Sequence, residues 1–161
     1  MIIGISGKAQ SGKDTAGLYL TGCQGFTRVA SADALKRIAM RTFNWDGQKD
    51  ERGRKFLQDL ATAVRNYDPD FWIKITLQEI ENRSLAKDFV ITDVRYKNEA
   101  NLLKEKGAIL IRIEREGIKK YDHPSETELD DYEGFDYRIY NNGTIEELES
   151  VLKNILIDIR R

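Results

Sequence analysis

The sequence predicts a three-layer α/β/α fold, in which a parallel sheet of about five strands lies between two layers of helices. Two observations lead to this prediction. Short runs of apolar and β-branched residues alternate with longer segments of helical periodicity, and this alternation favours a parallel sheet with helices on both faces. A glycine-rich turn also joins the first apolar run to the first helical segment. Such sheets bind ligands at the carboxyl ends of their strands.

Five short segments are predicted to form the strands of this sheet. They are Ile2 to Ser6, Gly25 to Ala30, Asp88 to Val94, Ala108 to Ile113 and Tyr137 to Tyr140. The third and fourth segments are rich in β-branched residues, so we expect them to be buried within the sheet.

Six segments are predicted to form helices. They run from Lys13 to Thr21, from about 31 to 43, from 51 to 67, from Pro69 through Ile80, from about 98 to 106, and onward from Thr144. Asp68 and Pro69 match an N-cap followed by proline at the first helical position. Thr144 with Glu147 matches a capping box.

Composition favours one domain spanning residues 1–161. The chain is 40% hydrophobic, 33% charged and has a net charge of −1, so no global attraction draws it to nucleic acid or to an anionic membrane. The single cysteine, Cys23, cannot form an intrachain disulfide. No apolar run approaches the roughly 20 residues needed to cross a bilayer, and no basic leader precedes the first strand. We therefore expect a cytoplasmic protein, and leave open whether it forms a homodimer.

The glycine-rich turn is the most specific motif. Residues 7–13 read G-x-x-x-x-G-K between a strand and a helix, as a Walker A motif requires. Backbone N–H groups of such a loop surround phosphate oxygens, and the lysine reaches the β- and γ-phosphates. The residues expected to bind ATP are Gly7, Ala9, Ser11, Gly12, Lys13, Asp14 and Thr15. Asp14 replaces the usual Ser or Thr, and its carboxylate could hold Mg²⁺ directly or through water.

A second carboxylate and an arginine follow the third predicted strand. Asp93 ends an apolar run, as in a Walker B pattern, and would lie near the metal or polarise the attacking oxygen. Arg95 would point into the cleft, where its planar fork suits a phosphate. Taken alone, Asp93 could be a turn residue and Arg95 a surface arginine paired with an acid.

Further basic residues are candidates for an acceptor site and a lid. Lys36 and Arg37 follow Asp33 in one predicted helix and could bind an acceptor phosphate, and Arg65 ends the next helix, where a cation is favoured in any case. Trp72 lies on an apolar stripe that favours core packing over base stacking.

The segment after the fourth strand carries another set of charged residues. Phosphotransferases close a basic lid over the transferring group, which singles out Arg115 in a lid at about 115–135. His123, the lone histidine, could act as a base, although a structural role is an equal alternative.

Taken together, these motifs resemble the deoxynucleoside monophosphate kinases of the type found in bacteriophages, with dephospho-CoA kinase as a more distant relative. The matching residues are Gly7 to Thr15, Ala32 to Lys36, Gln58, Arg65, Phe71-Trp72, Asp93 to Arg95, Asn98-Glu99, Arg115, His123 to Glu126 and Asn141 to Thr144. They cover nearly the whole chain in the expected order.

The resemblance implies a P-loop NTPase fold of the nucleotide-kinase type and phosphoryl transfer from ATP-Mg²⁺ to a deoxynucleoside monophosphate. It implies a helical substrate-binding insert at about residues 31–86. Acceptor residues would be Asp33, Lys36, Arg65, Trp72, Arg95 and Glu126; the metal would lie at Asp14 and Asp93; and the loop at Asn141 would pass near adenine. Catalysis would rest on Lys13, Asp93, Arg95 and Arg115.

Other functions remain open at this level. A P-loop kinase could use another acceptor, such as dephospho-CoA, a nucleoside or a small metabolite. The chain could instead be a nucleotide-binding module that senses ATP without catalysis, although basic groups around a second pocket argue against this. A kinase acting on nucleic-acid ends is disfavoured by the near-neutral charge.

Overall fold

The structure is a computed structural model that describes residues 1–83, 85–119 and 123–161. The chain divides into two compact units. The first unit comprises Met1–Arg28 and Leu85–Arg161, and the second comprises Val29–Ser84. The bounds of the second unit nearly coincide with those of the helical insert expected at about residues 31–86.

Five strands in the described residues form one sheet, in the order β2-β3-β1-β4-β5. Their bounds are Ile2–Gly7 for β1, Thr27–Val29 for β2, Phe89–Ile91 for β3, Ile109–Glu114 for β4 and Tyr137–Tyr140 for β5. β1 pairs in parallel with β3 and with β4, and β4 pairs in parallel with β5. The prediction of a parallel sheet of about five strands is therefore confirmed.

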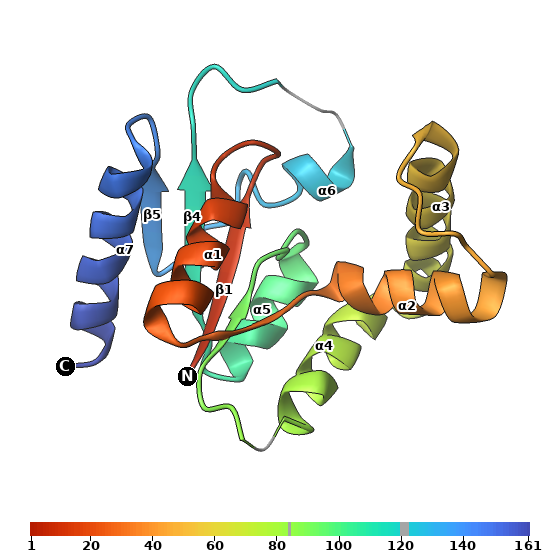
Figure 1. The fold of residues 1–161 in the computed structure, drawn as a ribbon, viewed down its shortest axis with the longest axis horizontal. Coiled ribbons are helices and arrows are strands. Elements are labelled where there is room, and N and C mark those ends of the chain that lie inside the picture. Colours follow the sequence, from red (N-terminus) through yellow and green to blue (C-terminus); the bar gives the residue numbers. More distant parts are fainter. Residues whose placement is uncertain (84, 120–122) are drawn as a thin grey trace. The chain divides into compact units, whose positions relative to one another are not determined.

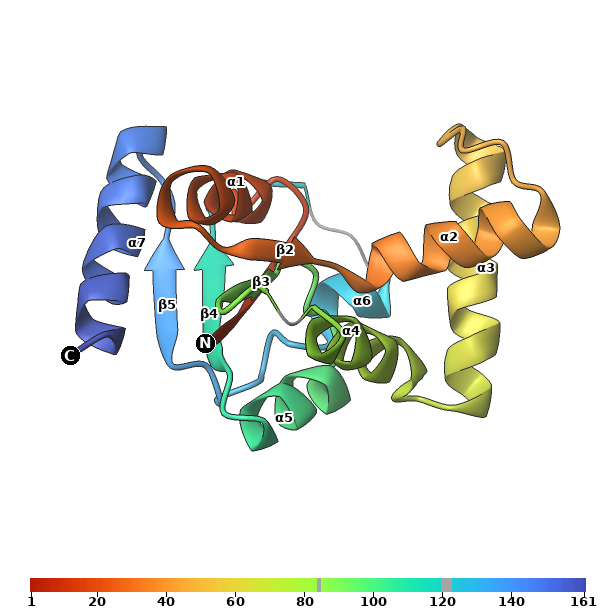
Figure 2. The same cartoon turned by 60° about the horizontal axis from the view of Figure 1, so that its bottom comes forward.

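Helices cover both faces of the sheet in the first unit. They are α1 (Lys13–Gln24), α5 (Lys97–Glu105), α6 (Pro124–Thr127) and α7 (Ile145–Ile159). Figure 2 shows α1 and α7 on one face and α5 on the other, which gives the three layers predicted. Alternate residues of a strand point to opposite faces, so Ile111 and Ile113 join the buried core beneath α1 and α7. Arg112, which lies between them in the strand, points to the opposite face.

The second unit consists of three helices in the described residues, α2 (Ser31–Phe43), α3 (Glu51–Tyr67) and α4 (Phe71–Glu81). Figure 1 shows them in orange, yellow and yellow-green. The predicted start of α4 is wrong, because the helix begins at Phe71 with Asp70 as its N-cap. The Asp68 carboxylate instead accepts a hydrogen bond from the Asp70 N–H at 3.0 Å, so Asp68 and Pro69 form a turn ahead of the helix.

No helix within residues 1–83, 85–119 and 123–161 is both long enough and apolar enough to cross a bilayer.

Asp50 supplies a side-chain cap for α3, and its removal should weaken the second unit. Its Oδ1 accepts a hydrogen bond from the Gly53 N–H at 2.7 Å, which satisfies one of the free donors of the first turn. We expect Asp50→Ala to lower the free energy of unfolding by about 1 kcal/mol, as measured by urea denaturation. The control is Asp59→Ala in the same helix, whose exposed ion pair with Lys55 should contribute under about 0.5 kcal/mol. Equal losses for both variants would contradict the capping role.

Candidate functional site

The loop between β1 and α1 has the backbone of a phosphate-binding loop. Gly12, the N-cap residue of α1, has a φ of 103°, and Gln10 has a φ of 67° although it is not a glycine. Residues with side chains rarely adopt this left-handed region, and they concentrate at functional sites. The Ser11 N–H and the Lys13 ammonium both donate to the Lys8 carbonyl, at 3.1 and 3.2 Å, which closes the loop on itself.

Two features of the loop fit an anionic ligand. The N-terminus of α1 carries backbone N–H groups and the positive end of the helix dipole, and a glycine N-cap brings no side chain to cover them. The loop also packs closely against β4, since a Cβ added to Gly7 would lie 2.3 Å from Ser11 Oγ and 2.6 Å from the Ile113 carbonyl oxygen. Ser11 Oγ is buried and has no hydrogen-bond partner among the described residues.

Lys13 lies at the centre of a charged cluster. Its side chain is almost fully buried, with 7% of the residue exposed. Burial and then the positive charge of Arg95 lower the pKa of Lys13, although Asp14, Glu126 and Asp93 oppose this shift. A buried ammonium is costly unless it is paired, so the site favours a bound polyanion that would pair with it.

The lowered pKa of Lys13 predicts a loss of activity at alkaline pH. The charged form exists below the folded-state pKa and is lost as the pH rises through it, at a pH below the reference value of 10.5. We expect kcat/KM for ATP, which reports the free enzyme, to fall in that range. Lys13→Arg stays protonated throughout and should lack this alkaline limb. If kcat/KM falls at the same alkaline pH in wild type and in Lys13→Arg, the group that titrates is not Lys13.

Arg95 and Glu126 meet beside the loop. Arg95 Nη1 is paired with Glu126 Oε1 and donates to the Ser125 carbonyl at 3.3 Å, while Glu126 Oε2 accepts from the Ala9 N–H of the loop at 2.7 Å. Burial opposes ionisation of Glu126, but the Ala9 N–H and the hydrogen bond and charge of Arg95 outweigh it, and the pKa of Glu126 is lowered. The Glu126 carboxylate therefore accepts a hydrogen bond from a loop N–H of the kind that binds phosphate.

Helix α6, which carries Glu126, was not predicted. Its N-cap is His123, whose Nδ1 accepts a hydrogen bond from the Ser125 N–H at 3.2 Å. The histidine that could have served as a base thus has a local structural role. Pro124 at the first helical position was the one available sequence signal for this helix.

Asp14 and Asp93 supply a donor set that fits Mg²⁺. Both carboxylates are close enough to Lys13 to influence its pKa, so both border the phosphate loop. The described residues contain no cluster of three or more carboxylate, histidine or cysteine side chains that could hold a metal. Magnesium in kinases commonly takes only one or two carboxylates, with phosphates and waters completing its shell. Thr15, the residue after Asp14, is half-buried in the first turn of α1.

Arg115 follows β4 and is exposed. It lines a pocket of about 410 Å³ together with Lys8, Arg112 and Asp130, among others. Asp130 was not predicted as a site residue, yet its carboxylate accepts from Lys8 Nζ and from Arg112 Nη2, each at 2.7 Å. It therefore ties the phosphate loop to β4. Of the lid expected at about 115–135, residues 120–122 lie outside the described residues.

Asn141 lies directly after β5 and is 8% exposed. Its side-chain amide donates to the carbonyl oxygen of Ser11 at 2.9 Å. The residue expected beside adenine therefore contacts the backbone of the phosphate loop.

The other four predicted acceptor residues lie in the second unit. Lys36 Nζ is 3.1 Å from Asp33 Oδ1 within the first turns of α2. Arg65, in the last turn of α3, donates from Nη1 to the Ala61 carbonyl at 3.5 Å. Trp72 is 2% exposed, and its Nε1 donates to the same carbonyl at 3.2 Å. This burial agrees with the core packing that its apolar stripe favours.

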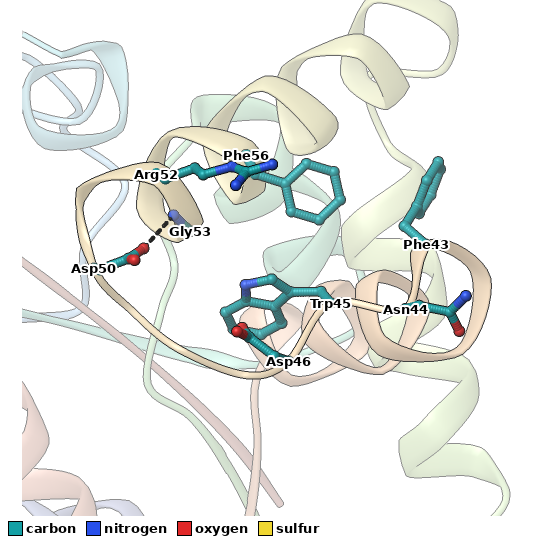
Figure 3. A pocket seen from close by; sticks show the side chains of 8 residues that line it. All are labelled: Phe43, Asn44, Trp45, Asp46, Asp50, Arg52, Gly53 and Phe56. Atoms are coloured by element: carbon teal, nitrogen blue, oxygen red, sulfur yellow. Dashed lines mark hydrogen bonds between the residues drawn. The ribbon is translucent and has the colours of Figure 1, made fainter.

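The second unit also has a pocket of about 460 Å³ where α2 leads into α3 (Figure 3). Its described lining comprises Phe43, Asn44, Trp45, Asp46, Asp50, Arg52, Gly53 and Phe56, so it includes none of the four predicted acceptor residues of this unit. The rings of Phe43 and Phe56 meet edge to face, with their centroids 5.7 Å apart.

Comparisons with known proteins identify the family of this chain. A family model described as deoxynucleotide monophosphate kinase matches residues 48–152. A provisionally named deoxynucleotide monophosphate kinase of Acanthamoeba polyphaga mimivirus is 32% identical, and the alignment covers 93% of each chain. The deoxynucleotide monophosphate kinase of Enterobacteria phage T4 is 33% identical over 64% of this chain and 44% of the phage protein.

A solved structure shows the same fold at low sequence identity. Shikimate kinase from Aquifex aeolicus vf5 has a TM-score of 0.59 at 16% identity, with 99% of this chain and 96% of that chain covered. The fold is accordingly that of the P-loop kinases. With the family model matching well over half of its length, the chain belongs to the deoxynucleotide monophosphate kinase family.

Proposed function

We propose that this chain transfers the γ-phosphoryl group of ATP to a deoxynucleoside monophosphate, yielding ADP and the deoxynucleoside diphosphate. The observation that carries the proposal is the cluster of Lys13, Arg95 and Glu126 at the phosphate loop, in a chain of this family. The arrangement suits a reaction in which positioning and electrostatics supply most of the catalysis.

The phosphate loop would hold the donor nucleotide. In our proposal, the phosphates are bound by backbone N–H groups of the Gly7 to Thr15 loop other than those of Ala9 and Ser11, which donate to Glu126 and to Lys8, and Lys13 bridges the β- and γ-phosphates. An acceptor phosphate oxygen attacks the γ-phosphorus, and the bond from that phosphorus to the bridging oxygen breaks, so that ADP leaves with the electron pair. Arg95 and Arg115 would neutralise the charge that spreads over the transferring group.

A bound Mg²⁺ supplies further charge neutralisation at the phosphate oxygens. Asp14 and Asp93 would hold it, directly or through water.

A further set of residues is proposed to bind the acceptor. We assign Asp33, Lys36, Arg65, Arg95 and Glu126 to acceptor binding, with the second unit serving as the substrate-binding insert; Trp72, 2% exposed, packs in the core of that unit. The region at about 115–135 would serve as the lid. We assign the reaction to the cytoplasm, because both nucleotides are cytoplasmic metabolites.

The test is ADP release from ATP-Mg²⁺ with dAMP, dGMP, dCMP, dTMP or dephospho-CoA as acceptor, with identification of the phosphorylated product. Release stimulated by one or more deoxynucleotides, with formation of the matching diphosphate, is the expected result. Stimulation by dephospho-CoA alone would show that the acceptor is not a deoxynucleotide, and the assignment of the donor site would stand. Tight ATP binding without turnover for any acceptor would contradict the proposed catalysis and favour a nucleotide-sensing module.

A further inference from the structure

We propose that Asn141 is a positioning residue that fixes the backbone of the phosphate loop, and that the turn containing it joins this loop to the segment that carries Arg115. The inference rests on the proposed use of the loop as a nucleotide site. It assigns Asn141 a role that does not require contact with the nucleotide.

The side-chain amide of Asn141 donates a buried hydrogen bond of 2.9 Å to the Ser11 carbonyl. A trans peptide is planar, with its C=O and N–H pointing in opposite directions. Because the Ser11 carbonyl points at Asn141, the N–H of the same peptide, which belongs to Gly12, points away from Asn141. Asn141 therefore sets the direction of an N–H at the start of α1, where anions bind.

Close packing explains why residue 12 must be glycine at this contact. A Cβ added to Gly12 would lie 2.3 Å from Asn141 Nδ2 and 3.4 Å from Asn141 Cγ, with Leu148 Cδ2 at 3.5 Å. The φ of 103° independently disfavours any side chain. The amide of Asn141 thus lies directly against the Gly12 Cα, with no space for the loop to shift toward it.

The same turn holds the segment that carries Arg115. The Asn141 N–H donates to the Glu114 carbonyl at 2.7 Å, and the side chain of Asn142 accepts from the Glu116 N–H at 2.9 Å. These two bonds flank Arg115 on both sides. Two adjacent asparagines therefore connect the phosphate loop with the segment that carries Arg115.

The test compares Asn141→Asp with wild type in two assays: affinity for ADP-Mg²⁺ by titration calorimetry, and steady-state kinetics with the accepted deoxynucleotide. Asp has nearly the same shape but presents a carboxylate to the Ser11 carbonyl in place of a donor. We expect ADP affinity to fall about tenfold, with a matching rise in KM for ATP, while KM for the deoxynucleotide changes less than twofold. Asn154→Asp, exposed on α7, is the matched control and should not alter either constant.

The outcomes separate this inference from the proposed function. If wild type does not bind ADP, the nucleotide-site assignment itself fails. If wild type binds ADP and Asn141→Asp binds it equally well, only the positioning role is overturned. A uniform loss of ADP affinity, deoxynucleotide affinity and thermal stability would also overturn it, because that pattern indicates general structural damage.

Discussion

Lys13→Ala should lower kcat by about 100-fold or more while leaving the fold intact. Lys13 is the buried cation of the phosphate loop, and a preorganised donor that stabilises developing charge contributes about 2.7–4 kcal/mol to catalysis. Its own hydrogen bond is a single contact at 3.2 Å to the Lys8 carbonyl, so its removal should cost little stability. The measurements are ADP release with the best deoxynucleotide acceptor and the midpoint of thermal unfolding.

Lys153→Ala, on the exposed face of α7, is the control for removing a lysine and should keep wild-type turnover. Lys13→Arg retains the charge but adds bulk in a buried site, so it should fall between wild type and Lys13→Ala. Wild-type turnover in Lys13→Ala would disprove the assignment of the loop as the donor site.

The elements that the sequence predicted best are those specified by local signals. Strand β5 has the predicted bounds, Tyr137–Tyr140. The capping box before α7 forms as expected, with Thr144 N–H donating to Glu147 Oε2 at 3.0 Å and Glu147 N–H donating to Thr144 Oγ1 at 3.3 Å. Both features depend on residues close together in the chain, so spacing alone reveals them. The phosphate loop was predictable for the same reason.

The contacts that shape the site were not predictable, because they join distant residues. Glu126 meets the Ala9 N–H across 117 positions, and Asn141 meets the Ser11 carbonyl across 130 positions. Neither pairing has a spacing rule, since each depends on how loops at the carboxyl ends of β1, β4 and β5 converge. Helix α6 was missed because its four residues, Pro124–Thr127, are too few to show helical periodicity.

The start of α4 shows how a local signal can also mislead. Asp68 followed by Pro69 has the pattern of a helix N-terminus, yet the structure uses Asp70 as the N-cap. The Asp68 carboxylate is drawn instead to the Asp70 N–H and to Lys74, whose ammonium is 3.1 Å away. The Lys74 hydrogen bond is the largest cause of the lowered pKa of Asp68.

Arg95→Ala should lower kcat/KM by about 100-fold to 1,000-fold, the range observed when one preorganised donor is removed from a site of developing charge. Arg95 is held beside the loop by Glu126 and by Ser125, and its backbone N–H donates to the buried Glu99 carboxylate at 2.9 Å. The guanidinium is thus oriented before substrate binds. Arg160→Ala, a partly exposed arginine 3.8 Å from Asp88, is the control and should be neutral.

A double-mutant cycle separates catalysis by Arg95 from simple pairing with Glu126. If Arg95 only neutralises Glu126, then Glu126→Gln should remove the need for Arg95, and the double variant should recover most of the activity that Arg95→Ala loses. If Arg95 acts on the transferring phosphate, its removal should still cost about 100-fold in the Glu126→Gln background. The quantity measured for each variant of the cycle is kcat/KM for ATP at a saturating concentration of the acceptor.

The pH profile gives a second, independent measure of where Arg95 acts. Its positive charge is the second contribution that lowers the pKa of Lys13, after burial. Removing that charge should raise the pKa of Lys13, so the alkaline limb of kcat/KM in Arg95→Ala should move to higher pH. A limb that moves this way while the rate falls shows that Arg95 is close enough to Lys13 to share its phosphate. A reduced rate with an unmoved limb would mean that Arg95 acts elsewhere, and the proposed charge cluster would have to be abandoned.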